Sequence, residues 1–460
     1  MSIFSPAPAR DRPNLSPRAG VAAPAQDERL YRDLIAQRPA LLDEKVKIHA
    51  RIIDEFNLAL LERMPREELV RELRVYVGDY VRVERIPLNQ RELQAFVEDL
   101  VDEMIGFGPI EPLLKDPTIT DILINTHKKC FVERFGRLEE TTVHFKDEGH
   151  LLRIIHKIVA AVGRRVDESS PTVDARLPDG SRVNVAIRPI AVDGPLVSIR
   201  KFSKMPFSME RLLELGALKV PIADVLQAAV HGRISMIISG GTGSGKTTLL
   251  NALSSHIPPD ERIITIEDAA ELQLQLPHVA RMETRPANAE GKGELRQREL
   301  VKNALRMRPD RIIIGECRGD EAFDMLQAMN TGHEGSMTTV HANTPRDAIK
   351  RLEQMVGMAG TAMTIASVRS QIASAVRMIV QLQRLPDGSR RITSVCEITG
   401  MEGEVLQMQE LYKFTKESTD ERGMIRGSFR ATGIRPLFLA DLKHAGIDLP
   451  ASYFDPMRPL

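Results

Sequence analysis

The sequence of 460 residues contains no tryptophan, few aromatic residues and no net charge. Aromatic residues make up 4 % of the chain, which leaves few side chains on which unpaired bases could stack. Lysine plus arginine and aspartate plus glutamate both number 63, so no excess of positive charge attracts a polyanion. The composition therefore argues against a protein that binds nucleic acid.

Cysteine is also scarce, and long apolar runs are missing. The three cysteines, Cys130, Cys317 and Cys396, are far apart and include no C-x-x-C pair. This spacing argues against a structural zinc site or a disulfide framework and indicates a reducing compartment. No apolar run is long enough to cross a bilayer, and the first residues lack the apolar core of a signal peptide. We expect a cytoplasmic protein that meets a membrane only peripherally, through its partners.

The most informative feature that is present is a glycine-rich loop. The apolar residues 234–238 are followed by Gly-Gly-Thr-Gly-Ser-Gly-Lys-Thr-Thr at 240–248. A strand, a glycine loop and a helix in this order form a P-loop, in which backbone N–H groups converge on phosphate oxygens. Lys246 would reach the β- and γ-phosphates of ATP, and Thr247 would bind Mg²⁺. The predicted nucleotide-binding residues are Gly241, Thr242, Gly243, Ser244, Gly245, Lys246, Thr247 and Thr248.

Length and hydrophobic patterning predict an α/β protein of two or three domains. The predicted parts are a disordered tail (1–28), a helical bundle (29–105), a mixed α/β N-domain (106–203), a linker (204–208), an α/β nucleotide-binding domain (209–400) and a C-terminal extension (401–460). Strands that alternate with helices in the nucleotide-binding domain favour a parallel sheet covered on both faces. Its strands are predicted at 234–239, 263–266, 311–315, 337–341 and 376–382.

One heptapeptide, Arg-Leu-Pro-Asp-Gly-Ser-Arg, occurs twice, at 176–182 and 384–390. Proline fixes φ and glycine accepts a positive φ, so each copy predicts a hairpin turn. The flanking residues of the two copies do not match. We therefore interpret the repeat as shared turn chemistry and not as a duplicated domain.

Hydrolysis of a bound nucleotide also requires an acid that holds Mg²⁺ and a group that orients water. Glu316 follows an apolar strand, at the ligand-binding edge of a doubly wound sheet, and suits a role on Mg²⁺. Glu271 is our candidate to orient and partly deprotonate the attacking water, with Glu267 and Asp268 in support. The sequence leaves open whether Glu271 or Glu316 is the general base.

Histidine and arginine supply the remaining catalytic candidates. His333 and His341 lie at opposite ends of the predicted strand 337–341, where they could sense the γ-phosphate or polarise water. Arg182 and Arg200 lie on predicted strands of the N-domain, and guanidinium groups stabilise charge on a transferring phosphoryl group. A second basic cluster is expected to be mostly solvated or subunit-facing: Arg296, Arg298, Lys302, Arg306, Arg308 and Arg311.

Taken in order, four sequence boxes resemble those of the type II/type IV secretion ATPase superfamily. The likeness is strongest to its tight-adherence (Flp/Tad) pilus branch, the CpaF-like ATPases. The boxes are Walker A at 240–247, Ile-Glu-Asp-Ala-Ala-Glu-Leu at 266–272, Walker B at 308–316 and Gly-His-Glu-Gly-Ser-Met-Thr-Thr-Val-His-Ala-Asn at 332–343. Residues 106–122 are similar to the start of the family's N-domain. The resemblance covers roughly residues 105–400.

This resemblance implies a homohexameric motor that binds ATP and Mg²⁺ between an N-domain and a RecA-like ATPase domain. It implies that Arg182 and Arg200 reach the phosphates. It also implies docking on a pilus platform protein at the cytoplasmic face of the inner membrane, to drive pilus assembly or related secretion. The tetra-cysteine zinc element of type II secretion ATPases is missing, which favours the pilus or type IV relatives.

Two other functions remain open at this stage. A DNA translocase would also use a RecA-like ring, although the neutral charge and few aromatic residues disfavour it. A nucleotide-gated docking scaffold would bind ATP with little turnover. The complete set of acids and arginines argues against the scaffold.

Overall fold

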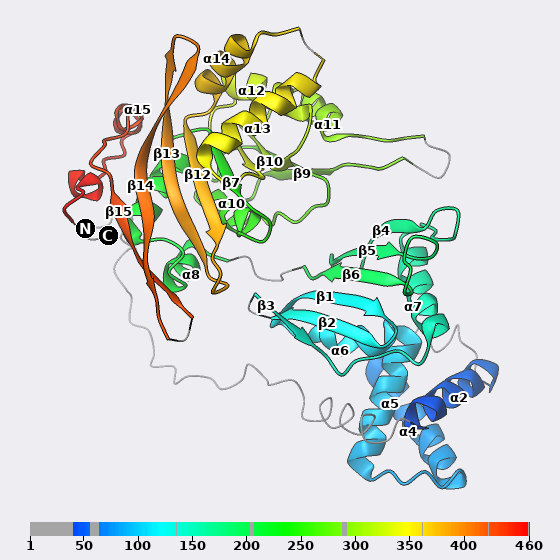
Figure 1. Cartoon of the computed structure of the whole chain (residues 1–460). Helices are drawn as coiled ribbons and strands as arrows, with labels where there is room; N and C mark the ends of the chain where they lie inside the picture. The colour runs from blue at the N-terminus through cyan, green and yellow to red at the C-terminus, as the bar shows by residue number, and fades with distance from the viewer. Residues whose placement is uncertain are drawn as a thin grey trace. The chain divides into compact units, whose positions relative to one another are not determined.

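The computed structural model describes residues 40–55, 64–134, 136–202, 207–287, 292–360, 362–421, 423–458 and 460. These residues form two units, the first ending at residue 202 and the second beginning at residue 207 (Figure 1). The predicted tail, 1–28, and most of the predicted linker lie outside the described residues.

The first unit begins with helices that share a hydrophobic core. They are α2 (Ala40–Glu55), α4 (Arg66–Val83) and α5 (Gln90–Ile105). Helix α4 starts directly after Pro65, and Glu67 and Glu68 lie in its first turn, near the positive end of the helix. At the start of α5, Asn89 Oδ1 accepts a hydrogen bond from the Glu92 N–H, and Glu92 Oε2 accepts one from the Asn89 N–H. The buried cluster beneath these helices includes Phe96.

A six-stranded antiparallel sheet completes the first unit, with strand order β3-β2-β1-β6-β5-β4. Its strands are β1 (Ile119–Thr126), β2 (Lys129–Arg134), β3 (Arg137–Glu140), β4 (Thr172–Arg176), β5 (Arg182–Ala186) and β6 (Leu196–Arg200). The short η1 (Gly108–Ile110) and α6 (Glu111–Lys115) precede β1. Helix α7 (Glu148–Ala161) buries Ile155 and Ile158 in the same core as Val183 and Ile199.

The second unit is built on a nine-stranded sheet with order β15-β14-β13-β12-β7-β11-β10-β8-β9. Its strands are β7 (Met236–Gly240), β8 (Ile263–Glu267), β9 (Val279–Glu283), β10 (Arg311–Cys317), β11 (Met337–Val340), β12 (Met378–Arg384), β13 (Arg390–Glu402), β14 (Val405–Thr419) and β15 (Ile425–Ala431). The strands from β12 to β9 run parallel, whereas β12, β13, β14 and β15 pair antiparallel. The predicted parallel sheet is confirmed.

Helices cover both faces of this sheet. They are α8 (Met209–Glu214), α9 (Val220–His231), α10 (Lys246–Ser254), α11 (Gln297–Ala304), α12 (Glu321–Asn330), α13 (Pro345–Met358) and α14 (Ile365–Ala375), followed by α15 (Leu439–His444) and η2 (Ala451–Phe454). Successive side chains of a strand point to opposite faces, so Ile238 joins the core beneath α9 and α10, and Ile237 joins the core beneath α11–α14. Figure 1 shows the two groups of helices on the two faces.

The predicted boundary at residues 400 and 401 requires correction because it falls inside β13. Strands β14 and β15 extend the sheet, and Phe414 and Phe429 belong to the core that contains α9 and α10. Residues beyond 400 therefore complete the second unit and do not form a separate extension. The alternation of buried and exposed residues in these half-solvated strands is weaker evidence in a sequence than a continuous apolar run.

Arg311 also differs from expectation, since its side chain is completely buried. Its Nε donates to Glu261 Oε2 at 2.5 Å, and its NH2 group donates to Glu261 Oε1 at 2.8 Å. Its NH1 group donates to the carbonyl of Val230 at 2.5 Å. This member of the basic cluster is a structural residue at the start of β10, and no part of a solvated surface. No described helix is long and apolar enough to cross a membrane.

Candidate functional site

Four segments meet at one edge of the parallel sheet in the second unit. Strands β7, β8, β10 and β11 run in the same direction, so the residues that follow them lie at the same edge. This edge carries the glycine loop 241–245 after β7 and the acidic loop 268–272 after β8. It also carries Glu316, at the end of β10, and His341, after β11. In parallel α/β sheets, this carboxyl edge is where ligands bind.

The glycine loop has the shape that a phosphate group requires. Gly243 and Gly245 have φ values of 66° and 95°, in the left-handed region that favours glycine. Gly245 directly precedes α10, whose first residue is Lys246. A side chain at Gly241 would meet no atom within 4 Å, so the loop is open on that side. Open backbone at the positive end of a helix fits a bound polyphosphate.

The polar side chains of the loop and of the first turn of α10 are held close to the loop. Lys246 Nζ donates to the carbonyl oxygens of Gly240 and Gly241, both at 3.0 Å. Thr247 and Thr248 are half-buried in the first turn of α10. Among the described side chains, Ser244 Oγ is buried without a hydrogen-bond partner. Hydrogen bonds to two carbonyl oxygens thus hold Lys246 at the loop.

Glu267 organises the acidic loop. Its Oε2 accepts hydrogen bonds from the N–H groups of Glu271 at 2.8 Å and Leu272 at 2.9 Å. Its Oε1 is buried without a partner among the described residues. Burial raises the pKa of Glu267, and the two N–H groups oppose that shift only in part. Glu267 therefore acts on the backbone of the loop and sets the position of the half-buried Glu271.

Glu316 and Asp268 are joined by an arginine that the sequence analysis did not single out. Arg318 NH2 donates to Glu316 Oε2 at 2.5 Å, and Arg318 NH1 donates to Asp268 Oδ2 at 3.3 Å. Asp268 also accepts a weak hydrogen bond from Thr284 Oγ1 at 3.4 Å. One guanidinium group thus connects the ends of β8 and β10. Its place two residues after Glu316 is the only sequence signal for this role.

The two histidines lie at opposite edges of the sheet, so the expectation for His333 requires correction. Strand β11 begins where β7 begins, because Met337 pairs with Met236, and His333 precedes β11. His341 instead follows Val340, whose partner on β7 is Ser239. Within this unit only His341 shares an edge with the glycine loop. The expectation was wrong for His333 because the length of a strand separates its two ends.

Gln381 on β12 is a further residue that sequence analysis missed. Its side chain is almost fully buried, and Nε2 donates to the carbonyls of Ala342 and Asn343, both at 3.2 Å. These carbonyls belong to the segment directly after His341. Thr339 Oγ1 donates to Gly315 O at 2.7 Å and ties β11 to β10 just before Glu316. Both side chains stabilise the edge that carries the candidate site.

Arg182 and Arg200 lie on the sheet of the first unit. They face each other across the pair formed by β5 and β6, and Arg200 is also opposite Asp121 on β1. Arg200 Nε lies 3.5 Å from Asp121 Oδ1. The arginine side chain is largely exposed. The structure therefore brings the two arginines together as a pair, and their reach to a nucleotide stays a prediction.

The described residues include no group of three His, Cys, Asp or Glu side chains that could hold a metal ion. Thr247 and Glu316 stay the predicted Mg²⁺ ligands, and they would share the ion with phosphate oxygens and water. This suits Mg²⁺, which usually keeps several waters and binds through few protein ligands.

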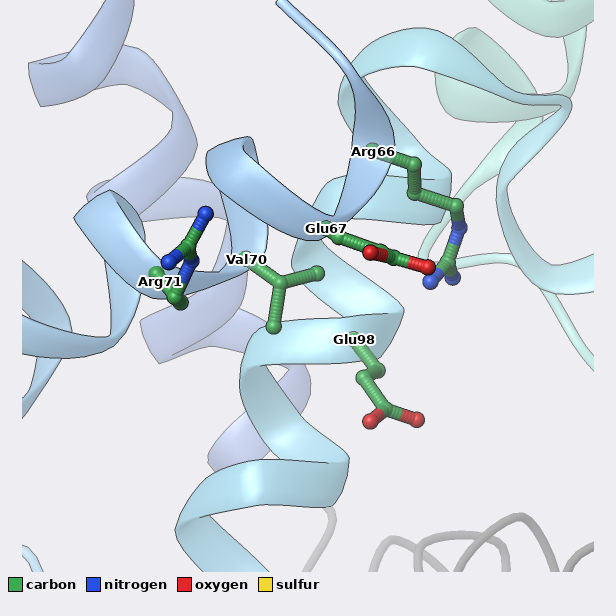
Figure 2. Close-up of a pocket in the computed structure, with 5 residues that line it drawn as sticks. All are labelled: Arg66, Glu67, Val70, Arg71 and Glu98. Carbon is green, nitrogen blue, oxygen red and sulfur yellow. The ribbon is translucent and has the colours of Figure 1, made fainter.

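An open pocket lies elsewhere, on the first unit, between α4 and α5. Its lining residues are Arg66, Glu67, Val70, Arg71 and Glu98. Figure 2 shows Val70 between Arg71 on one side and Glu67 and Arg66 on the other. Arg66 NH2 is already bound to Asp102 at 2.7 Å. Both acidic and basic side chains line this pocket, so its charge favours neither an anionic nor a cationic ligand.

Comparison with known proteins agrees with this geometry. Residues 103–434 match the family described as type II/IV secretion system protein. A protein of Mycobacterium tuberculosis, whose name assigns it to conjugal transfer, is 37 % identical over 69 % of this chain and 92 % of its own length. The type IV secretion system protein VirB11 of Bartonella quintana is 32 % identical over 67 % of this chain and 96 % of its own length.

Among solved structures, the VirB11 ATPase of the Brucella suis type IV secretion system is 30 % identical, with a TM-score of 0.34. That match covers 62 % of this chain and 91 % of the other. The assignment rests on the sequence matches. The chain belongs to the type II/IV secretion system protein family, a family of ATPases, and is an ATP hydrolase.

Proposed function

We propose that this chain is a motor that couples ATP hydrolysis to the movement of protein subunits in a pilus or secretion machine. The observation that carries the proposal is the convergence of four segments at one sheet edge. The glycine loop, Glu271, Glu316 and His341 lie at that edge, in a chain of the secretion family. Hydrolysis of a nucleotide requires a phosphate-binding loop, a ligand for Mg²⁺ and a group that orients water at one site.

Each group has a proposed role. The amides of the glycine loop and Lys246 hold the β- and γ-phosphates. Thr247 and Glu316 hold Mg²⁺, which neutralises charge on the phosphate oxygens when it is bound. Glu271 orients the attacking water, and His341 lies where it can sense the γ-phosphate. Arg182 and Arg200 from the first unit supply positive charge to the transferring group.

For the machine itself, we propose a homohexamer that drives assembly of a tight-adherence (Flp/Tad) pilus. It would act at the cytoplasmic face of the inner membrane through a platform protein. The order of the four sequence boxes and the residues in them support this branch. The names of the M. tuberculosis and B. quintana relatives support a motor of a related transport machine.

The test is ATP turnover by the purified chain with Mg²⁺. Lys246→Ala should abolish turnover and weaken ATP binding, because it removes the cation of the loop. Glu271→Gln should abolish turnover while ATP still binds. Arg430→Gln, on an exposed position of β15, is the matched control and should retain full activity. Wild-type turnover in both Lys246→Ala and Glu271→Gln would reject the proposed site.

The same purified protein distinguishes the motor from the two alternative functions, a docking scaffold and a DNA translocase. A docking scaffold would bind ATP but release no phosphate above the rate of Lys246→Ala, with or without its partner proteins. A DNA translocase would retain labelled DNA, with an affinity that falls steeply as the salt concentration rises.

A further inference from the structure

The repeated heptapeptide forms the same hairpin in both units. In the second copy, the Leu385 N–H donates to Ser389 O at 2.8 Å, and in the first copy the Leu177 N–H donates to Ser181 O at 2.9 Å. The glycines of the two turns have φ values of 84° and 92°. In both copies the aspartate accepts a hydrogen bond from the serine N–H at 2.9 Å. The same seven residues therefore form the same turn in both units.

The first and last residues of each heptapeptide are arginines that face each other across the hairpin. Arg176 is opposite Arg182 between β4 and β5, and Arg384 is opposite Arg390 between β12 and β13. An anion bound between two opposite arginines would be attracted by both of them.

The second hairpin lies against the glycine loop, because β12 pairs with β7. Arg390 Nε donates to Gly243 O at 2.8 Å. A Cβ atom on Gly243 would lie 3.5 Å from Arg384 NH1, and one on Gly245 would lie 3.6 Å from Arg390 Cδ. Both arginine side chains thus run beside the loop that is shaped for phosphate.

The hairpin is held firmly at its turn. Asp387 Oδ1 accepts from the Ser389 N–H, and Asp387 Oδ2 accepts from the Ile425 N–H at 2.8 Å, at the start of β15. Leu385 is buried beside the turn. Groups that are already ordered lose little conformational entropy when a ligand binds. The arginines therefore start from a backbone that needs no rearrangement.

We propose that Arg384 and Arg390 form an arginine clamp on the phosphate chain of the nucleotide bound at residues 241–245. This inference rests on the proposed function of that loop. A guanidinium group presents a planar fork of N–H donors that can bind phosphate oxygens in pairs, unlike the point charge of Lys246. The clamp belongs to the same unit as the loop, so it holds the ligand independently of Arg182 and Arg200. It makes tight nucleotide binding depend on the β12–β13 hairpin.

Calorimetry on the full chain tests the clamp, with ATP·Mg²⁺ and inorganic tripolyphosphate as the two probes. Arg384→Gln and Arg390→Gln should each lower the affinity for both probes by about 10- to 100-fold. This is the loss expected when a hydrogen bond to a charged group is removed. Arg384→Lys should restore part of the affinity, since it keeps the charge and loses the fork. Arg430→Gln is the control and should bind as the wild type does. Circular dichroism of each variant reports whether it is folded.

Two results would overturn the clamp while leaving the proposed function intact. The first is wild-type affinity for tripolyphosphate in both Arg384→Gln and Arg390→Gln. The second is a loss confined to Arg390→Gln, which would mean that Arg390 only braces the carbonyl of Gly243. A wild-type chain that binds neither ATP nor tripolyphosphate would overturn the proposed function itself, and the clamp with it.

Discussion

Glu267 positions Glu271 through the backbone: the Glu271 N–H donates to Glu267 Oε2 at 2.8 Å. The same oxygen accepts from the buried Leu272 N–H. A buried carboxyl group at the end of β8 therefore determines where the candidate catalytic carboxylate lies. Glu267 is a positioning residue, and Glu271 is the group assigned to the attacking water.

Glu267→Ala should reduce both stability and ATP turnover, because two backbone N–H groups would lose their acceptor. Each unsatisfied group costs about 1–3 kcal/mol. Glu267→Gln keeps one carbonyl oxygen at this position and should retain most of the turnover. Chemical denaturation and steady-state phosphate release measure the two effects. If Glu267→Gln were as inactive as Glu267→Ala, the carboxyl chemistry of Glu267 would matter, and positioning alone would be an insufficient account.

Arg318→Ala should lower the maximal rate of ATP turnover, since Arg318 lies between Glu316 and Asp268. Without the guanidinium group, two carboxylates at the same sheet edge lose the cation that connects them. We expect the maximal rate to fall about tenfold or more. Arg318→Lys keeps the charge and should keep most of the wild-type rate. A wild-type rate in Arg318→Ala would contradict this role.

The parallel strands of the second unit could be predicted because they are continuous apolar runs. Residues 312–314, three isoleucines, are buried on β10, which extends from Arg311 to Cys317. Strand β9 was missed because it is a half-exposed edge strand that includes Arg281 and Glu283. Residues that directly follow apolar strands, such as Glu316, are therefore the part of the site that a sequence reveals.

The order of the strands in the second unit's sheet could not be predicted from the sequence. Arg384 and Arg390 lie beside the glycine loop only because β12 is the neighbour of β7, although the two segments are far apart in the sequence. Gln381 supports the segment after His341 for the same reason. Contacts between side chains that are distant in the sequence depend on this topology and not on any local pattern.

Arg200→Ala should reduce turnover far more than ATP binding. A positive charge that acts on the transferring phosphoryl group affects the rate on the order of a thousandfold, by analogy with arginine fingers. The affinity for ATP should change less than tenfold, because the glycine loop supplies most of the ground-state contacts. Arg188→Gln, an exposed arginine paired with Glu148 in the same unit, is the control. Equal losses of affinity and rate would argue that Arg200 binds the ground state.

Glu103 should control the acid stability of the first unit. Burial alone would raise its pKa, but hydrogen bonding to His150 at 2.5 Å and the charge of Lys45 lower the pKa of Glu103 to about 2. Since this pKa lies below the ordinary value of 4.5, the carboxylate stabilises the fold above pH 4.5. That stabilisation, about 3 kcal/mol, is lost as the pH falls through about 2.

Hydrogen exchange of α5 at a series of pH values measures this effect in the first unit alone. Glu103→Gln should exchange faster than the wild type at neutral pH, and the difference should shrink as the pH falls towards 2. Lys45 also pairs with Asp99 at 2.7 Å, so it should keep a partner in the variant and the chain should still fold. A difference that does not change with pH would mean that the ionisation of Glu103 is irrelevant to stability.

Among the described ion pairs of the second unit, the buried pair of Arg311 and Glu261 should contribute most to the free energy of unfolding. Glu261→Gln leaves the buried guanidinium group of Arg311 without a carboxylate partner and should cost about 3–5 kcal/mol. Arg311→Met leaves Glu261 with only the exposed Arg233, at 3.2 Å, as its ion-pair partner and should also destabilise the unit. Arg426→Gln removes an exposed pair with Asp420 and should cost less than about 1 kcal/mol. In the double variant Glu261→Met with Arg311→Met, neither member of the buried pair is left without the other, so the loss should be smaller than the sum of the single losses. Additive losses in denaturant titrations would show instead that each side chain stabilises the start of β10 through separate contacts, such as that of Arg311 with the carbonyl of Val230.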